Sequence, residues 1–341
     1  MMAQYANIPP FFSLFLRSLL ELNTPTPHQQ AHRFLESEWG RRHAPHPPGF
    51  LTVRDVTASV WMSLLEEGIR FKTNPIYRTG ALQGQSVALL FQKTSTRTRC
   101  SFEIGSAELG AVPVVIDWRS SNFTLSALED ESAVLSRYCD LIVARVYHHS
   151  DLVTMQQHSR VPVVNGLCDL HHPCQALADM MTIRCVFGTC DVNLLYVGDG
   201  NNVCHSLIQA TVLTGARMRV ITPPHHAPDP AILAAAGDRV SLSHTMSDEA
   251  FTWADVVYTD TWVSMGQEDQ SEARMATFMS YQVSAEWMAK APAHAVFMHC
   301  LPAHRGMEVT ADVLDGRQSI VLDQAENRKH AQKALLCHLL T

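Results

Sequence analysis

The chain of 341 residues is long enough for two domains, and its 46% hydrophobic and 17% charged residues are typical of a globular protein. A formal net charge of −7 argues against a general nucleic-acid-binding protein, because such proteins concentrate basic side chains on one face. Nine cysteines without a Cys-x-x-Cys pair indicate reduced thiols rather than a disulfide framework. We therefore expect an intracellular, cytoplasmic protein, or one of the mitochondrial matrix if it is eukaryotic.

The first 48 residues form an N-terminal extension whose role the sequence does not reveal. An apolar run at residues 9–20 is interrupted by Ser13, Arg17 and Ser18, so it predicts an amphipathic helix rather than a membrane span. Acidic residues such as Glu21 make the extension a poor match to a transit peptide, which is normally free of acidic side chains.

From about Gly49 onward, short aliphatic runs alternate with segments of helical period, which is typical of parallel sheets covered by helices. The pattern predicts an α/β fold of two domains, each a mainly parallel sheet flanked by helices, with a C-terminal helix that returns to the first domain. We expect residues 49–168 with 324–341 to form the first domain and residues 169–323 the second.

The individual elements follow from the same runs. Predicted strands are Ser86–Phe91, Val112–Asp117, Leu141–Tyr147, Val161–Asn165, Asn193–Asp199, Met218–Thr222, Asp255–Thr261, Ala295–Leu301 and Ser319–Asp323. Helices Arg97–Leu109 and His172–Phe187 are each followed by a glycine, which is a common helix terminator. The last predicted helix is Ala325–Leu340.

A candidate anion site follows the first strand, where Ser95-Thr96-Arg97-Thr98-Arg99 opens a helix. Unpaired N–H groups and the positive end of the helix dipole attract anions at such a junction. Hydroxyl and guanidinium donors suit phosphate oxygens. A helix cap followed by solvated arginines is the ordinary explanation for a single Ser-x-Arg, but five donors favour anion binding. No G-x-x-x-x-G-K-[ST] motif is present, so a P-loop is not predicted.

These five residues match the Ser-Thr-Arg-Thr-Arg signature for carbamoyl phosphate in the aspartate and ornithine carbamoyltransferases, and the chain resembles that family over residues 49–341. The resemblance implies transfer of the carbamoyl group from carbamoyl phosphate to the side-chain amine of ornithine, giving citrulline and phosphate. This would be a step of arginine biosynthesis or of the urea cycle, with no cofactor and no metal ion. The resemblance also implies a homotrimer with active sites between subunits, and neither nucleic acid nor membrane as a partner.

Several further residues would contact carbamoyl phosphate. Arg145 interrupts an apolar strand, where a charge is costly unless it is salt-bridged or binds an anion. His172 and Gln175 match the family's His-Pro-x-Gln motif, which implies hydrogen bonds to the carbamoyl oxygen and amide. Thr98, Arg145 and His172 are candidates to stabilise negative charge on that oxygen. The resemblance assigns binding to Ser95, Thr96, Arg97, Thr98, Arg145, His172, Gln175, Cys300, Leu301 and Arg328, and catalysis to Arg145, His172, Cys300 and Arg328.

The second substrate would be bound by the other half of the chain. Gly198–Asn202 is not a dinucleotide fingerprint, because Val203 stands where a third small residue is required. Asp260 ends a predicted strand, where α/β proteins bind ligands, although such an Asp is often only a cap or a turn former. Cys300 lies in the ornithine branch's His-Cys-Leu-Pro motif and is implied to line the pocket of the reacting amine, where a thiolate could help to neutralise it. The resemblance assigns ornithine binding to Asn202, Asp260, Ser264 and Met265.

Two segments depart from the family pattern. In the family, a loop after the second strand lends a His or Gln to the neighbouring subunit, whereas residues 117–123 contain neither. Ser120, Ser121 or Asn122 could substitute. Glu129-Asp130-Glu131-Ser132 replaces the usual Asp-Thr-Ala, and a solvated acidic helix start is the simplest explanation.

Three alternatives remain open from the sequence. The first is a related transferase for putrescine, lysine or aspartate; putrescine would leave Asn202 idle, and aspartate would place its second carboxylate near Asp260. The second is a non-catalytic protein that binds carbamoyl phosphate on the same scaffold. The third is a zinc site, which lacks a recognised ligand spacing. Its ligands would come from His171, His172, His299, Cys300 and His304.

Overall fold

The computed structural model describes residues 26–42, 47–263 and 271–341. The chain divides into two compact units, Met1–Pro45 and His46–Thr341. The described part of the first unit is mainly helix α2 (Pro27–Arg42), which is exposed wherever its side chains are described. The amphipathic helix predicted at residues 9–20 lies outside the described residues. None of the described helices has the length and apolar character needed to cross a bilayer.

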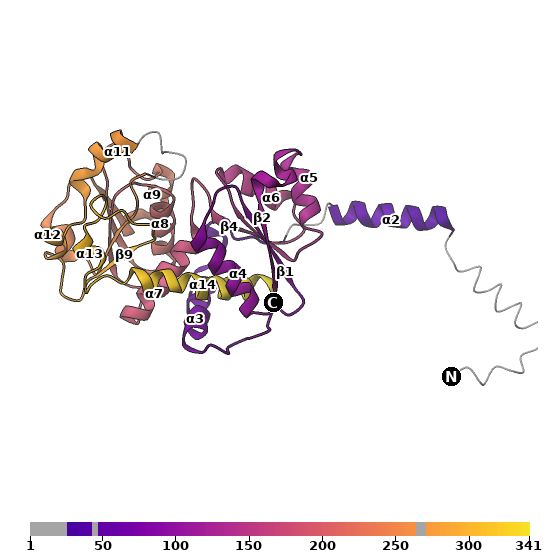
Figure 1. Ribbon diagram of the computed structural model, residues 1–341, viewed down its shortest axis with the longest axis horizontal. Helices are drawn as coiled ribbons and strands as arrows, with labels where there is room; N and C mark the ends of the chain where they lie inside the picture. The colour runs from indigo at the N-terminus through magenta and orange to yellow at the C-terminus, as the bar shows by residue number, and fades with distance from the viewer. Residues whose placement is uncertain (1–25, 43–46, 264–270) are drawn as a thin grey trace, which may run out of the picture. The chain divides into compact units, whose positions relative to one another are not determined.

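The unit His46–Thr341 contains two parallel sheets flanked by helices (Figure 1). The strands are β1 (Ser86–Phe91), β2 (Val112–Asp117), β3 (Leu141–Arg145), β4 (Val163–Leu167), β5 (Asn193–Val197), β6 (Arg217–Ile221), β7 (Val240–Ser243), β8 (Val256–Thr259) and β9 (Val296–His299). The first sheet has the order β2-β1-β3-β4, and the second has the order β7-β6-β5-β8-β9. The α/β class and the two-sheet architecture predicted from the sequence are therefore confirmed.

Helices flank the strands, and most of them connect parallel neighbours, as the parallel pairing requires. They are α3 (Ala58–Thr73), α4 (Thr96–Glu108), α5 (Leu128–Leu135), α6 (His149–His158), α7 (Pro173–Phe187), α8 (Asn202–Thr214), α9 (Pro230–Ala236), α10 (Asp248–Trp253), α11 (Ser271–Phe278), α12 (Ala285–Met288), α13 (Ala311–Leu314) and α14 (Val321–Leu340). Helix α7 begins with a proline. Its missing N–H costs nothing there, because the N–H groups of a first turn have no partner within the helix. The helix ends at Gly188, whose φ is 72°. The glycine terminator expected from the sequence is thus confirmed.

Helix α14 links the two halves of this unit. It packs against α3, α4 and α7 and also touches β9. In Figure 1 it runs beside α7 and α4, in yellow, back toward the part of the chain that carries the first sheet. Gln324 and Arg328, near the start of α14, are buried, and their side chains contact Asp179 and Gln175 of α7.

Eight predicted strands agree with the structure to within two residues at each end, and one prediction is wrong. Ser319–Asp323 is not a strand, because Ser319 forms only an isolated bridge to Phe297 and α14 begins at Val321. Short apolar runs of this kind cannot be assigned by periodicity alone. The strand that the sequence missed is β7, whose side chains are mostly exposed because it lies at a sheet edge.

Candidate active site

A cavity of about 510 Å³ lies where the carboxyl ends of strands from both sheets face each other. Ligands commonly bind at this end of parallel sheets. The cavity is large enough for two small molecules of the size of a phosphate ester and an amino acid. Most of the predicted site residues line it: Ser95, Arg97, Thr98, Arg145, His172, Gln175, Asn202, Asp260, Cys300, Leu301 and Arg328.

Three predicted residues are not among those that line the cavity. Thr96 lines a neighbouring groove instead, on the other side of the α4 N-terminus. Ser264 and Met265 lie outside the described residues.

The N-terminus of α4 supplies one end of the cavity. Ser95 caps the helix, and its Oγ accepts the Thr98 N–H at 3.3 Å. The Thr98 side chain is buried, and its Oγ1 accepts hydrogen bonds from Nη1 of Arg145 and Nη2 of Arg328, each at 3.3 Å. A hydroxyl and two guanidinium groups therefore meet at a helix N-terminus, which together form a strongly anion-attracting surface.

Arg145 is the last residue of β3 and lies beside an irregularity in β4. Ala144 pairs with Asn165 and Arg145 pairs with Leu167, which leaves Gly166 of β4 as the extra residue of a β-bulge. The pairing of β3 with β1 stays regular through Arg145. Burial, together with neighbouring Arg328 and Arg97, lowers the pKa of Arg145 to about 10. The guanidinium therefore stays charged at neutral pH, and an anion with two negative charges would relieve the repulsion among these cations.

His172 and Gln175 open α7 beside these arginines. The backbone N–H of His172 donates to Oγ of Ser206 at 2.8 Å, which fixes the start of the helix. Burial, followed by the charges of Arg328 and Arg145, lowers the pKa of His172 well below its ordinary value. The imidazole is therefore neutral, and it can donate one hydrogen bond without adding to the positive charge.

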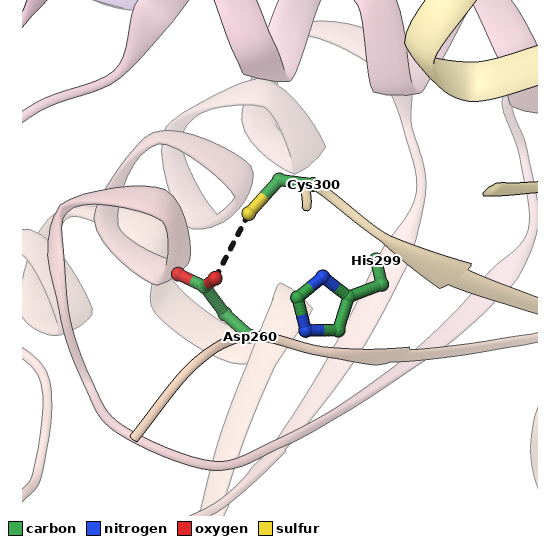
Figure 2. A group of neighbouring side chains, drawn as sticks. All are labelled: Asp260, His299 and Cys300. Atoms are coloured by element: carbon green, nitrogen blue, oxygen red, sulfur yellow. Dashed lines mark hydrogen bonds between the residues drawn. The ribbon is translucent and has the colours of Figure 1, made fainter. Parts of the chain in front are cut away.

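A carboxylate and a thiol face the anion-attracting end. The buried Asp260 follows β8, and its Oδ2 accepts Nδ2 of Asn201 at 2.7 Å. Its Oδ1 accepts the Thr261 N–H at 2.7 Å. The same oxygen accepts the Cys300 thiol at 2.9 Å (Figure 2). Burial and the charge of Asp260 raise the pKa of Cys300 well above its ordinary value, which favours the thiol over the thiolate considered from the sequence. Asn202, at the start of α8, donates to the Cys168 carbonyl at 2.6 Å.

Asp260, His299 and Cys300 are the one group among the described residues whose ligand atoms are close enough to share a metal ion (Figure 2). His171, His172 and His304, which the zinc alternative included, do not belong to this group. His299 is also engaged elsewhere. Its Nδ1 accepts the Leu301 N–H at 2.8 Å, and its Nε2 lies 3.3 Å from the buried Glu308. These contacts give the imidazole a structural role beneath the loop that carries Cys300.

Sequence reasoning missed an ion pair at the end of the cavity that carries Asp260. Arg274 of α11 donates to Oδ2 of Asp199 and, at 2.5 Å, to the Trp262 carbonyl. Burial raises the pKa of Asp199 to about 6, while the ion pair with Arg274 opposes this rise. Both residues line the cavity, and His226 lies 3.6 Å from Asp199. Asp199 follows a strand just as Asp260 does, so the rule that selected Asp260 could have found it too.

Comparison with known proteins gives consistent matches over most of the chain. Residues 49–185 match the family model described as "Aspartate/ornithine carbamoyltransferase, carbamoyl-P binding domain", and residues 190–339 match the companion "Asp/Orn binding domain". An ornithine carbamoyltransferase of Methanothermobacter thermautotrophicus is 49% identical, over 82% of this chain and 95% of that protein.

Solved structures agree with these sequence matches. The ornithine carbamoyltransferase from Pyrococcus furiosus superposes with a TM-score of 0.82 at 43% identity, covering 86% of this chain and 97% of that one. The corresponding structure from Thermus thermophilus has a TM-score of 0.80 at 37% identity, with 87% and 100% covered.

Proposed function

This chain belongs to the aspartate/ornithine carbamoyltransferase family, and from this premise we propose that it transfers the carbamoyl group of carbamoyl phosphate to the side-chain amine of ornithine. The products are citrulline and phosphate. One observation carries the choice of substrates. A cluster of guanidinium groups at the N-terminus of α4 shares a single cavity with the buried Asp260 carboxylate and the Cys300 thiol.

Carbamoyl phosphate is a doubly charged acyl phosphate that suits the cationic end. The phosphate is held by the α4 N-terminus with Ser95, Arg97 and Thr98. Thr96 is assigned to the phosphate as well, because it belongs to the same family motif. The carbamoyl oxygen is directed toward Thr98, Arg145, His172 and Arg328. The distances of 3.3 Å from both guanidinium groups to the Thr98 hydroxyl support this placement, because they bring the donors together at one point.

In the reaction, the neutral amine of ornithine attacks the carbamoyl carbon, and negative charge develops on the carbamoyl oxygen. Prepositioned donors lower the barrier by about 3–4 kcal/mol each when such charge develops in a water-poor site. The new C–N bond forms as the C–O bond to phosphate breaks. The departing phosphate accepts the proton that the amine loses, so the step requires neither a side-chain nucleophile nor a metal ion.

Ornithine is bound by the facing end. Asp260 and Asn202 contact its α-amino and α-carboxylate groups, with Ser264 and Met265 assigned by the family motif. Cys300 and Leu301 lie beside the reacting amine and the carbamoyl group. Aspartate is disfavoured as the acceptor, because its second carboxylate would meet the acidic side chains Asp199 and Asp260, which both line the cavity.

The domain assignment made from the sequence fits this division of labour. Residues 49–168 with 324–341 hold the phosphate, whereas residues 169–323 hold ornithine and also supply His172 and Gln175 to the carbamoyl group. The contacts of α14 with α3 and α4 support the return of the C-terminal helix to the first domain. The two family models divide the chain between residues 185 and 190 instead, after α7 rather than before it.

We also propose that the active form is a homotrimer in the cytoplasm. The edge strand β2 supports this assembly, because Val112 and Val114 are 59% and 47% exposed. Asn122 is the best substitute for the missing intersubunit His or Gln. Its side chain is exposed, whereas the Ser121 hydroxyl donates within its own turn to the Trp118 carbonyl at 2.7 Å.

A substrate panel tests the proposal. The purified chain is supplied with carbamoyl phosphate and with ornithine, lysine, putrescine or aspartate, and the carbamoylated product of each amine is measured. We expect citrulline to form fastest. Faster carbamoylation of another amine would mean that this amine, rather than ornithine, is the acceptor. Binding of carbamoyl phosphate in calorimetry without any product would instead favour the non-catalytic alternative.

A further inference from the structure

A buried carboxylate that the proposed chemistry does not use lies one helical turn beyond Gln175. Asp179 of α7 is 0% exposed. Its Oδ1 accepts Nε2 of Gln175 at 2.8 Å and Nε2 of Gln324 at 2.7 Å, and its Oδ2 accepts the Tyr258 hydroxyl at 3.1 Å. Burial raises the pKa of Asp179 to about 6. A charge in such a place is unfavourable for stability compared with a well-packed apolar residue, which suggests that it has another use.

Asp179 determines the orientation of the Gln175 side-chain amide. Gln175 stands between Asp179 and Arg328, and Nη1 of Arg328 donates to its Oε1 at 2.5 Å. A carboxylate only accepts hydrogen bonds and a guanidinium only donates them. A flipped amide would therefore oppose NH₂ to guanidinium and oxygen to carboxylate. The amide nitrogen must point to Asp179, which leaves the carbonyl oxygen on the side of Arg328 and the cavity.

The carboxylate itself is held from three elements. Gln175 and Asp179 are four residues apart on α7 and so share one face of that helix. Tyr258 comes from β8 and Gln324 from α14. Gln324 uses its other amide atom as well, because its Oε1 accepts the His299 N–H at 2.9 Å. This network leaves the Asp179 carboxylate little freedom to turn.

We propose that Asp179 is a positioning residue that holds the Gln175 carbonyl oxygen toward the amino group of carbamoyl phosphate. The amide oxygen has two lone pairs, so one can accept from Arg328 and the other from the substrate N–H. The site thereby selects a carbamoyl group over an acyl group of similar shape that lacks this N–H. The inference rests on the proposed function and adds the residue that sets selectivity within that site.

The test compares two phosphates that differ at this amino group. Acetyl phosphate carries a methyl group in place of NH₂ and cannot donate to Gln175. In full-length protein with Asp179→Leu, which removes the acceptor for Gln175 at nearly constant volume, we expect the KM for carbamoyl phosphate to rise roughly ten- to hundredfold. The competitive inhibition constant of acetyl phosphate should change by less than about twofold, since it never uses the Gln175 oxygen. A purely structural role would raise both constants together.

Tyr258→Phe is the matched control. It removes another donor to the same carboxylate but leaves the Gln175 amide between Asp179 and Arg328. Both constants should stay within about twofold of the wild-type values, even if the protein unfolds at a lower temperature. Equal changes in the two constants for Asp179→Leu, or no change in either, would overturn the proposal.

An exchange variant covers the case in which Asp179→Leu does not fold. In Gln175→Glu/Asp179→Asn the carboxylate moves to position 175, where it can accept from the new amide at position 179, from Arg328 and from the substrate N–H. A KM for carbamoyl phosphate within about tenfold of wild type supports the proposal, and a larger loss contradicts it. Wild-type turnover of carbamoyl phosphate and ornithine, measured in parallel, separates this result from a failure of the proposed function.

Discussion

The two ends of the cavity obtain their polarity in different ways. At the cationic end, the donors come from one short segment at the α4 N-terminus, supplemented by Arg145 and Arg328, and the charges all have the same sign. At the facing end, the Asp260 carboxylate is already satisfied by Asn201, Thr261 and Cys300, which come from three loops. The first end is therefore unbalanced until an anion arrives, whereas the second is preorganised and selects by the position of its groups.

The cationic end is where we expect the largest effect of a single substitution. Arg97→Ala should lower kcat/KM for carbamoyl phosphate by roughly 10²–10³-fold, because it removes a charged donor from the phosphate in both the ground state and the transition state. Arg99→Ala is the control, since Arg99 is exposed and pairs with Glu103 on the same helix at 3.1 Å. Steady-state kinetics that showed equal losses for the two arginines would contradict the assignment of this helix start.

A substitution at the carboxylate end should change a different kinetic constant, the KM for ornithine. Asp260→Asn removes the negative charge that faces the α-amino group, so the KM for ornithine should rise roughly ten- to hundredfold while the KM for carbamoyl phosphate changes little. Asp248→Asn is the control, because Asp248 pairs with Lys290 at an exposed position. If Asp260→Asn instead raised the KM for carbamoyl phosphate, the two ends of the cavity would have been assigned the wrong way round.

The sequence predicted strands that have a continuous apolar run better than a strand that lacks one. The buried strand β1 and the edge strand β2 both agree with the prediction at both ends, because their apolar runs are bounded by clear turns. The exposed strand β7 carries serines and was missed. Ser319–Asp323 was taken for a strand, since a short apolar run at the start of a helix has no period to distinguish it.

The residues of the site also differ in how well the sequence predicted them. Residues in contiguous motifs, such as Ser95 to Thr98 and His172 with Gln175, could be identified from the sequence and the family resemblance. The ion pair of Asp199 and the network around Asp179 could not be identified in this way, because the partners of both carboxylates are distant in the chain. Arg274 lies 75 residues from Asp199, and Gln324 lies 145 residues from Asp179. Such pairs become visible only when the fold brings the two segments together.

A histidine cluster near the cavity should make this unit sensitive to acid. Burial, with neighbouring His149 and His205, lowers the pKa of His171 to about 3. In the unfolded chain a histidine titrates near pH 6.5, so below that pH the unfolded state binds a proton that the folded state does not. The free energy of unfolding should therefore fall as the pH drops from about 6.5 toward 4.

Urea unfolding at several pH values measures this dependence. His171→Gln should reduce its slope by about 1.4 kcal/mol per pH unit, the value for one proton. An unchanged slope in the variant would mean that His171 is protonated in the folded protein, contrary to its burial beside two other imidazoles.

The smallest effect is expected at Cys300, where the two ends of the cavity meet. Its thiol donates to Asp260 at 2.9 Å, and thiols are weak donors, so Cys300→Ala should raise the KM for ornithine only about fivefold. Cys300→Ser keeps a donor at the same place and should stay within about twofold of wild type. Because burial and Asp260 raise the pKa of Cys300, the serine variant should also keep the wild-type dependence of kcat/KM for ornithine between about pH 7 and 9. A large loss of activity in the serine variant would mean that a thiolate takes part in the reaction, and the carboxylate end would then supply reactivity as well as position.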